Sequence, residues 1–169
     1  MEFFLADSIE PYIPELSSLL EDCVMDGASI GFLWPMAHQE ADEYWWNVEA
    51  QRAQGERLCW LAVSKANVIG TVQLAMPSKP NARHRAEVEK LMVHPAYRNK
   101  GIARSLMALL QSAAIVHQRT LLVLDTRYGD PASALYRSLG FFEAGQIPGF
   151  ALNNEGSTDA TVYFYKSFN

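Results

Sequence analysis

The segment from Ala86 to Asp125 constrains the fold of this chain more than any other feature of the sequence. Residues 86–93 predict a strand, and residues 120–125 predict an apolar strand that ends in a carboxylate, Asp125. Between them, residues 101–117 predict a helix whose apolar face carries Ile102, Leu106, Leu109, Ala113 and Val116. A strand, a helix and a second strand in this order form two parallel strands with a right-handed crossover.

The segments on either side extend this unit to an α/β (α+β) fold. We expect further strands near residues 3–5, 57–63, 68–76, 141–142 and 161–168, and helices over 14–25, 38–54 and 131–139. Ala66-Asn67 predicts the tight turn between the second and third strands. The order βααβββαβαββ describes a mixed central sheet of about seven strands flanked by four helices. No linker or repeat interrupts it, so we expect residues 1–169 to form a single domain.

The charge of the chain limits its partners. Its 14 Lys and Arg against 19 Asp and Glu give a formal net charge of −5, which argues against nucleic acid or an anionic membrane as the main partner. No apolar stretch approaches the length of a membrane span, and residues 1–7 lack the basic leader of a signal peptide. Cys23 and Cys59 are far apart and predict reduced core thiols, and the isolated histidines predict no metal site. We therefore expect a cytoplasmic protein that binds no metal.

The basic turn between Val93 and Gly101 predicts an anion-binding site. A helix that opens at Gly101 places free backbone N–H groups and the positive end of its dipole at the turn. Arg98, Lys100 and Arg104 add positive charge, and a pyrophosphate fits this chemistry. The chain has neither G-x-x-x-x-G-K-[ST] nor G-x-G-x-x-G, which weakens a nucleoside triphosphate or dinucleotide interpretation. The alternative is an ordinary connection whose basic side chains lie in solvent.

Two motifs together resemble those of a known family. The run 87–103 and the later segment Leu135-Tyr136-Arg137-Ser138-Leu139-Gly140-Phe141 resemble the R/Q-x-x-G-x-G/A coenzyme A loop and the L-Y-x-x-L-G-F segment of the GNAT superfamily of acetyl-CoA-dependent N-acetyltransferases. Further blocks, at residues 27–32, 84–93, 124–126 and 145–150, resemble the tabtoxin resistance branch of that superfamily. The resemblance implies the GNAT fold, with acetyl-CoA as co-substrate and an amine as acceptor.

The resemblance also implies a coenzyme site. Main-chain atoms of residues 91–93 would pair with the pantetheine arm, amides of residues 98–103 would hold the pyrophosphate, and the thioester would enter where the strands ending at Val93 and Asp125 splay apart. The implied coenzyme-binding residues are Leu91, Met92, Val93, Arg98, Asn99, Lys100, Gly101, Ile102, Ala103, Arg104 and Tyr136. Many family members carry an Asn that contacts the pantetheine where this chain has Gly129-Asp130-Pro131, so the chain departs from the family pattern there.

Three carboxylates are candidates for the base that acetyl transfer to an amine requires. Asp125 is the first choice, because open α/β sheets bind ligands at the C-terminal ends of parallel strands and because it matches the strand-end aspartate of the tabtoxin resistance branch. In the alternative interpretation Asp125 caps the following turn or pairs with Arg127. Glu87 and Glu89 compete with it, since alternation puts both on one strand face and Glu87 matches the base of histone-type members. Otherwise they belong to a solvated face.

The acid and the acceptor site are assigned in the same way. Tyr136 matches the family tyrosine beside the coenzyme sulfur and is the expected acid, with a core tyrosine as the alternative. The amide of Val93 is the family candidate for stabilising the oxyanion. We expect residues 27–36 and 147–150 to wall the acceptor site, and Trp34 and Trp46 to line that site or a dimer contact. The expected substrate-binding residues are Ser29, Phe32, Trp34 and Asp125.

We therefore predict an N-acetyltransferase that moves an acetyl group from acetyl-CoA to the amine of a small molecule, such as an amino-acid-like toxin or antibiotic. Transfer is direct, within a ternary complex. The alternatives are a protein or peptide N-acetyltransferase, which predicts an open acceptor groove, a catalytically silent acyl-CoA-binding module, and an interaction protein that uses the tryptophan-rich region. We expect no nucleic-acid or membrane partner, and a monomer or homodimer.

Overall fold

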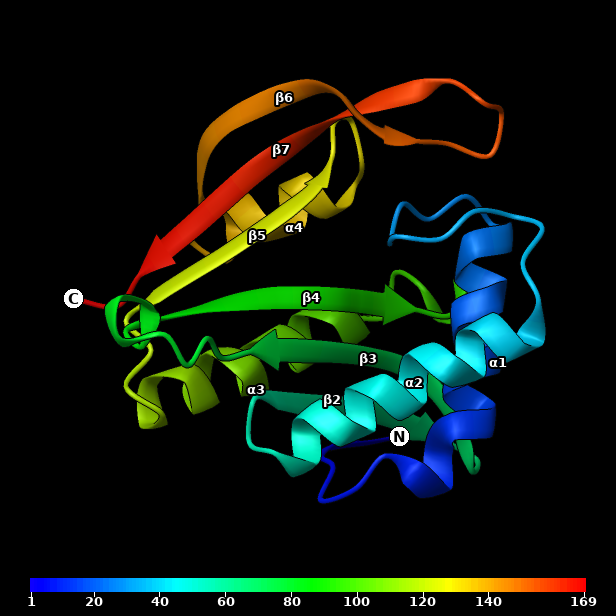
Figure 1. Ribbon diagram of the computed structural model, residues 1–169, viewed down its shortest axis with the longest axis horizontal. Coiled ribbons are helices and arrows are strands. Elements are labelled where there is room, and N and C mark those ends of the chain that lie inside the picture. The colour runs from blue at the N-terminus through cyan, green and yellow to red at the C-terminus, as the bar shows by residue number, and fades with distance from the viewer.

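The computed structural model describes residues 1–169, which build a seven-stranded sheet with helices on both faces (Figure 1). The strands lie in the order β1-β2-β3-β4-β5-β7-β6. Their bounds are β1 (Glu2–Leu5), β2 (Arg57–Ser64), β3 (Asn67–Ala75), β4 (Arg85–Val93), β5 (Leu121–Arg127), β6 (Phe142–Leu152) and β7 (Thr158–Ser167). The predicted fold class and element order are confirmed.

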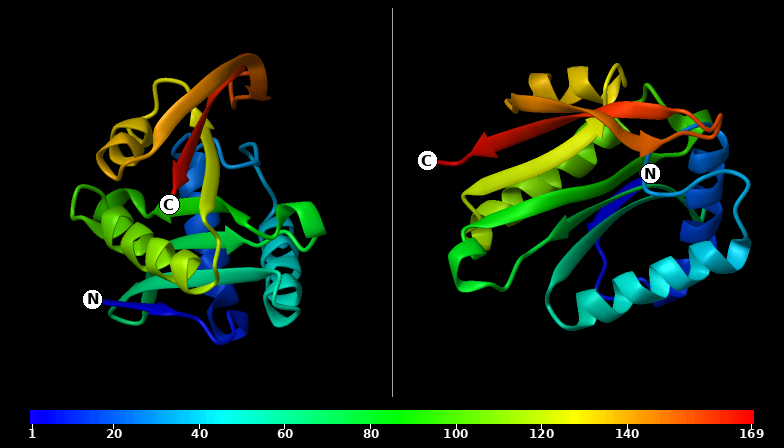
Figure 2. Two further views of the ribbon diagram at one scale, coloured as in Figure 1. Left: turned by 90° about the vertical axis from the view of Figure 1, so that its left-hand side faces the viewer. Right: turned by 45° about the horizontal axis from the view of Figure 1, so that its top comes forward.

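The helices are α1 (Ile13–Met25), α2 (His38–Ala53), α3 (Ile102–Val116) and α4 (Ala132–Ser138), with short 3-10 turns at η1 (Glu10–Tyr12), η2 (Pro80–Ala82) and η3 (Pro95–Tyr97). Figure 2 shows α1 and α2 on one face of the sheet and α3 and α4 on the other. Each face has its own core. Leu106, Tyr136 and Phe164 belong to the core under α3 and α4, whereas Trp45 and Met92 belong to the core under α1 and α2. No helix is both long and apolar enough to cross a membrane.

The sheet separates between its two parallel strands. All other neighbouring strands are antiparallel, and β4 and β5 pair only from Arg85↔Leu121 to Glu87↔Val123. Beyond these pairs the two strands diverge, as Figure 1 shows, so the main chain of β4 after Glu87 has no strand partner on that side. The predicted separation of these strands is confirmed.

A β-bulge in β4 changes which face its side chains occupy. Met92 pairs with Thr71 and Glu89 pairs with Gln73, so two residues of β4 lie opposite the single residue between them on β3. Lys90 is the extra residue, since its φ of 53° is left-handed and its ammonium lies over the ring of Tyr44 in α2. Leu91 packs instead against the core under α3. Glu89 and Lys90 therefore face the same side, although strict alternation would separate them.

Three local predictions are corrected. Leu109 and Val116, predicted on the apolar face of α3, are 37% and 78% exposed. The buried face instead continues through Met107, Leu110 and Ala114, because the ridge of residues spaced four apart from Leu106 packs on the sheet. The turn after β2 is Lys65-Ala66, one residue earlier than predicted, since Ser64 still pairs with Asn67 and both turn residues have positive φ. Strand β5 runs on to Arg127, so Asp125 lies within it.

The hairpin of β6 and β7 is longer than predicted and includes residues 147–150 in β6. Its tip, opposite α1 in Figure 1, lies against the loop that joins α1 to α2. The side chain of Asn154 links the two: its Oδ1 accepts from the Trp34 amide at 2.8 Å, and its Nδ2 donates to the Val24 carbonyl at 3.2 Å. We call this pair of bonds the Asn154 clasp.

Candidate active site

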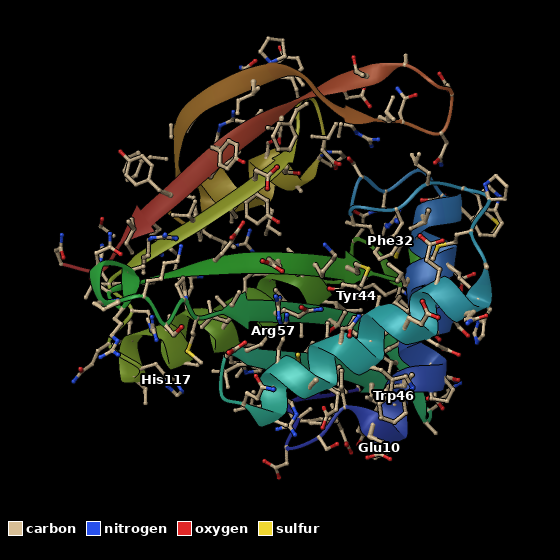
Figure 3. All side chains as sticks on the ribbon, viewed as in Figure 1. Glu10, Phe32, Tyr44, Trp46, Arg57 and His117 are labelled. Carbon is tan, nitrogen blue, oxygen red and sulfur yellow. The ribbon has the colours of Figure 1, made fainter.

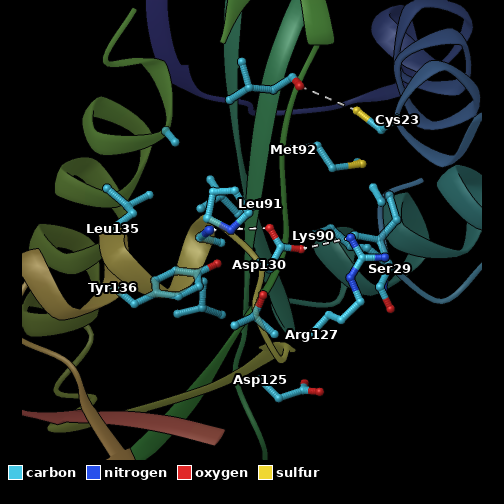
Figure 4. Close-up of a pocket in the computed structure, with 18 of the residues that line it drawn as sticks. Cys23, Ser29, Lys90, Leu91, Met92, Asp125, Arg127, Asp130, Leu135 and Tyr136 are labelled. Atoms are coloured by element: carbon cyan, nitrogen blue, oxygen red, sulfur yellow. Dashed lines mark hydrogen bonds and ion pairs between the residues drawn. The ribbon is translucent and has the colours of Figure 1, made fainter. Parts of the chain in front are cut away.

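A cavity of about 1020 Å³ occupies the gap between β4 and β5. It is lined from the α3 and α4 side by residues such as Gly101 and Tyr136, and from the α1 and α2 side by Ser29, Glu87 and Lys90. Figure 4 shows side chains from both groups pointing into it. The cavity therefore passes through the sheet and connects its two faces.

The turn before α3 offers unpaired backbone donors at one end of the cavity. No backbone carbonyl accepts from the amides of Asn99, Lys100 or Gly101, and the first turn of a helix leaves further amides free. Gly101 has a φ of 77°, and a Cβ built there would meet nothing within 4 Å. The approach to these amides is thus open. The turn has the free donors, the helix dipole and the space that a pyrophosphate requires.

The three basic side chains of the turn have different surroundings. Arg98 lines the cavity, but its guanidinium pairs with Asp26 of the α1–α2 loop and donates to the Val93 carbonyl at 3.3 Å. Arg104 lines the cavity and donates to Ser138 Oγ at 2.8 Å.

Lys100, in contrast, does not line the cavity. Its ammonium lies 4.9 Å from the ring centroid of Tyr97 and 3.5 Å from the Ala96 carbonyl. The expected contribution of this side chain to the coenzyme site is therefore corrected, because its flexible stem turns back on η3. Its amide remains among the free donors.

The main chain of β4 forms one wall of the cavity. Leu91, Met92 and Val93 all line it, and no strand pairs with this edge beyond Glu87. Unpaired strand edges carry free N–H and C=O groups that can accept an extended partner. The Val93 carbonyl also accepts a hydrogen bond from the thiol of Cys23, with 3.7 Å between sulfur and oxygen. Ile102 and Ala103, the remaining predicted coenzyme residues, line the same cavity.

The candidate bases are close to one another on the α1 and α2 side. Glu87, Glu89 and Asp125 all line the cavity, but Glu89 forms an ion pair of 2.6 Å with Arg57, whose side chain is 13% exposed. Figure 3 shows Arg57 between α2 and the sheet, near Tyr44. Glu87 forms no ion pair. Burial, then the negative charges of Glu89 and Asp125, raise the pKa of Glu87.

Asp125 neither caps a turn nor pairs with Arg127. Its carboxylate accepts from Thr161 Oγ1 of β7 at 2.7 Å. Arg127 donates instead to the Gly27 carbonyl at 2.9 Å and pairs with Asp130 at 3.6 Å. The alternative interpretation of Asp125 is therefore wrong, and its carboxylate is available at the cavity.

Tyr136 is both a core residue and a cavity residue. It is 6% exposed and packs against Phe141 and Phe164, with ring centroids 5.9 Å away in each case. Figure 4 shows its hydroxyl turned toward the interior of the cavity. Burial, with the nearby carboxylates of Asp130 and Asp125, raises its pKa well above the usual range, and no hydrogen bond offsets this effect. At neutral pH the Tyr136 hydroxyl is therefore protonated.

The predicted acceptor residues divide into two groups. Ser29 and Asp125 line the cavity, whereas Phe32 packs edge-on against Tyr44 at 5.3 Å and lines a smaller adjacent pocket of about 500 Å³. Trp34 lines neither pocket, and its backbone amide donates to Asn154 in the clasp. Trp46 is 49% exposed and points away from the sheet in Figure 3, so it does not line the acceptor site.

Sequence reasoning did not place Arg127 or Lys90 at the cavity. Arg127 was overlooked because the strand was expected to end at Asp125. Lys90 was overlooked because alternation places it with Ala86 and Val88, which are buried in the core under α3. A lysine at such an apolar position was the available signal of an irregular strand.

The family model described as "Acetyltransferase (GNAT) family" matches residues 14–141. The chain belongs to this family. The family's acetyl donor is acetyl-CoA, so the predicted family and its co-substrate are confirmed. The two motifs that carried the resemblance, the turn before α3 and the segment around Tyr136, line the same cavity.

Known proteins show a similar fold. The N-acetylaspartate synthetases of Homo sapiens and Rattus norvegicus are 33% and 32% identical over 100 residues, which cover 56% of this chain but 32% of each relative. Among solved structures, the ribosomal-protein-alanine N-acetyltransferase from Brucella melitensis has a TM-score of 0.83 and 22% identity over 99% of this chain and 100% of its own. The structure of yncA from Salmonella typhimurium with its cofactor acetyl-CoA has a TM-score of 0.82 and 20% identity over 100% of this chain and 94% of its own.

Proposed function

We propose that the protein is an N-acetyltransferase that moves an acetyl group from acetyl-CoA directly to the amine of a small molecule. The observation that carries the proposal is the cavity through the sheet. It joins the free amides before α3 and the Tyr136 hydroxyl to the carboxylates of Glu87 and Asp125 on the other face. A donor and an acceptor that enter from opposite faces would meet between β4 and β5.

The residues around the α3 end of the cavity fit coenzyme A. The amides of residues 99–103 would hold the pyrophosphate, with Arg98 and Arg104 beside them. The unpaired edge of residues 91–93 would bind the pantetheine arm as an added strand. When bound, the coenzyme supplies the activated acetyl group. The amide of Val93 would stabilise the negative charge that develops on the carbonyl oxygen.

Glu87 and Asp125 would remove the proton from the acceptor's ammonium. A base works best when its pKa lies near the operating pH, and burial beside two carboxylates moves the pKa of Glu87 in that direction. Asp125 keeps one oxygen for the acceptor while Thr161 bonds the other. The ion pair with Arg57 makes Glu89 the weakest of the three candidates.

Tyr136 would protonate the departing thiolate, because its hydroxyl faces the cavity and stays protonated at neutral pH. No covalent acetyl-enzyme is required. The only cysteine at the cavity is Cys23, and burial raises its pKa to about 11, which keeps it a thiol rather than a nucleophilic thiolate. Transfer within a ternary complex is the mechanism that these groups support.

The acceptor end favours a small molecule over an extended peptide. The α1–α2 loop and the β6–β7 hairpin both line the cavity, and the Asn154 clasp joins these two segments beside the smaller adjacent pocket. An amino acid or an amino-acid-like toxin or antibiotic fits such a site. The name of the N-acetylaspartate synthetases supports the same substrate class, as does the resemblance of several sequence blocks to the tabtoxin resistance branch.

Release of coenzyme A thiol from acetyl-CoA tests the proposal. We expect release with at least one small amine from a panel of amino acids and amines, and little release with peptides that carry a free N-terminal alanine. A higher kcat/KM for the peptides would establish a protein N-acetyltransferase instead. Saturable binding of acetyl-CoA without release for any acceptor would establish a silent binding module.

A further inference from the structure

Most charged side chains on the acceptor side of the cavity are already paired. Three ion pairs account for them: Glu89 with Arg57 at 2.6 Å, Asp130 with Arg127 at 3.6 Å, and Asp26 with Arg98 at 2.5 Å. Asp159 accepts from Asn153 at 3.3 Å. The charges left over are the two carboxylates proposed as bases and one cation, Lys90, which forms no ion pair.

The ammonium of Lys90 lies at the acceptor side because of the bulge in β4. It is 5.6 Å from the ring centroid of Tyr44, and a Cβ added at Gly31 of the α1–α2 loop would lie 3.6 Å from it. Both contacts are weak for a cation, since one is with an aromatic face and the other with a backbone that carries no side chain. Loss of solvent lowers the pKa of Lys90, as expected for a half-buried ammonium without a carboxylate partner.

An unpaired cation beside two unpaired carboxylates is a complementary pattern for a zwitterion. The carboxylates of Glu87 and Asp125 attract an ammonium, and the ammonium of Lys90 attracts a carboxylate. A ligand with both groups would satisfy all three residues at once. A simple alkylamine would leave Lys90 as it is, partly removed from water and unpaired.

We propose that Lys90 binds the carboxylate of the acceptor, and that the acceptor is therefore an amino acid or a closely similar zwitterion. This inference rests on the proposed function, since it assigns the substrate class of the same site. Lys90 is then a specificity-determining residue. It discriminates amino acids from amines of the same shape that have lost the carboxylate, and from a protein N-terminus, which has no carboxylate next to its amine.

Matched acceptors test this assignment in the wild-type chain. Coenzyme A thiol release is measured with L-tyrosine against tyramine, L-leucine against isoamylamine, and L-lysine against cadaverine. An ion pair formed in a partly desolvated site changes affinity by roughly tenfold to a hundredfold. We therefore expect kcat/KM for the preferred amino acid to exceed that for its decarboxylated partner by roughly this factor.

Variants of Lys90 then locate the preference. Lys90→Met keeps the length of the stem without the charge, and it should lower kcat/KM for amino acids much more than for the amines, so that the preference for amino acids is lost. Lys90→Arg should retain the preference, and Lys90→Gln provides a second neutral variant. Lys79→Met, an exposed lysine outside the cavity, is the matched control. Affinity for acetyl-CoA and circular dichroism verify that each variant is folded.

The outcomes separate the two proposals. Turnover without a preference for amino acids, or a preference that persists in Lys90→Met, overturns the role of Lys90 and leaves the acetyltransferase intact. An equal loss for amino acids and amines in Lys90→Met also overturns it. No thiol release with any amine overturns the proposed function, and the assignment of Lys90 with it.

Discussion

Gly101→Glu should abolish acetyl-CoA binding without unfolding the chain. Gly101 has a φ of 77°, and a Cβ would meet no atom within 4 Å, so a side chain there adds backbone strain but no clash. That strain costs about 1 kcal/mol, which lowers Tm by roughly 2–4 °C in a chain of this length. A carboxylate about 5 Å from a pyrophosphate charge, at an effective dielectric constant of about 20, adds a repulsion of about 3 kcal/mol. Affinity should therefore fall at least roughly a hundredfold.

Two further variants separate strain from charge. Gly101→Ala and Gly101→Gln share the backbone strain of Gly101→Glu but carry no charge, so all three should melt at about the same temperature. Isothermal titration with acetyl-CoA should then rank Ala first, Gln second and Glu last. If Gly101→Glu binds acetyl-CoA as tightly as Gly101→Ala, the free amides before α3 are not the pyrophosphate site, and the coenzyme assignment is refuted.

Three other variants test separate parts of the site and the fold. Tyr136→Phe should lower kcat by roughly a hundredfold or more, the usual scale for a lost general acid, with no change in the Kd for acetyl-CoA. An unchanged kcat would return Tyr136 to a purely packing role. Burial raises the pKa of Glu87, so its ionisation destabilises the fold as pH rises above its usual pKa of about 4. Glu87→Gln should therefore raise Tm at neutral pH but not near pH 3, which is roughly one unit below the usual pKa of a glutamate. The same variant should lower kcat/KM. A Tm at neutral pH that is equal to or below that of the wild type would contradict the stability prediction. Hydrogen bonds from Arg52, Ile9 and Ser8 hold the pKa of Glu49 at about 2. The stabilisation that ionised Glu49 provides is present at neutral pH and is lost as pH falls toward that value. Glu49→Gln should therefore lower the free energy of unfolding, measured by urea denaturation at neutral pH, by on the order of 2 kcal/mol. Equal losses at neutral and strongly acid pH would refute the assignment.

The sequence predicted the architecture well because strong local signals agreed there. The apolar periodicity of residues 86–125 and the turn at Gly101 required two parallel strands with a helical crossover, which the structure contains. The carboxylates at 87 and 89 follow from strand alternation, and both line the cavity. The motif around Tyr136 placed that residue at the same cavity from a separate part of the chain.

The remaining features depend on pairing that a single sequence does not encode locally. Glu89 pairs with Arg57 and does not lie on a solvated face. This ion pair forms only because β2 and β4 lie on either side of β3. The position of Trp34 depends on the Asn154 clasp, which joins residues 120 positions apart in the chain, and Phe32 packs against Tyr44 of α2. The face that Lys90 occupies does not follow from strand alternation, because one bulge reverses that alternation.

The bulge in β4 is an insertion of one residue that the sheet does not require. If Lys90 were removed, Glu89 would still face α1 and α2, and Leu91 would still face α3. Leu91 would then lie opposite Val72, the single β3 residue that now faces both Lys90 and Leu91. Every other side chain of β4 would keep its present face, and the left-handed backbone at position 90 would disappear. Comparable strands could thus gain or lose such a residue without redesign of either core. With the role proposed for Lys90, the gain or loss of this one residue would change which molecules the site accepts while the rest of the fold stays the same.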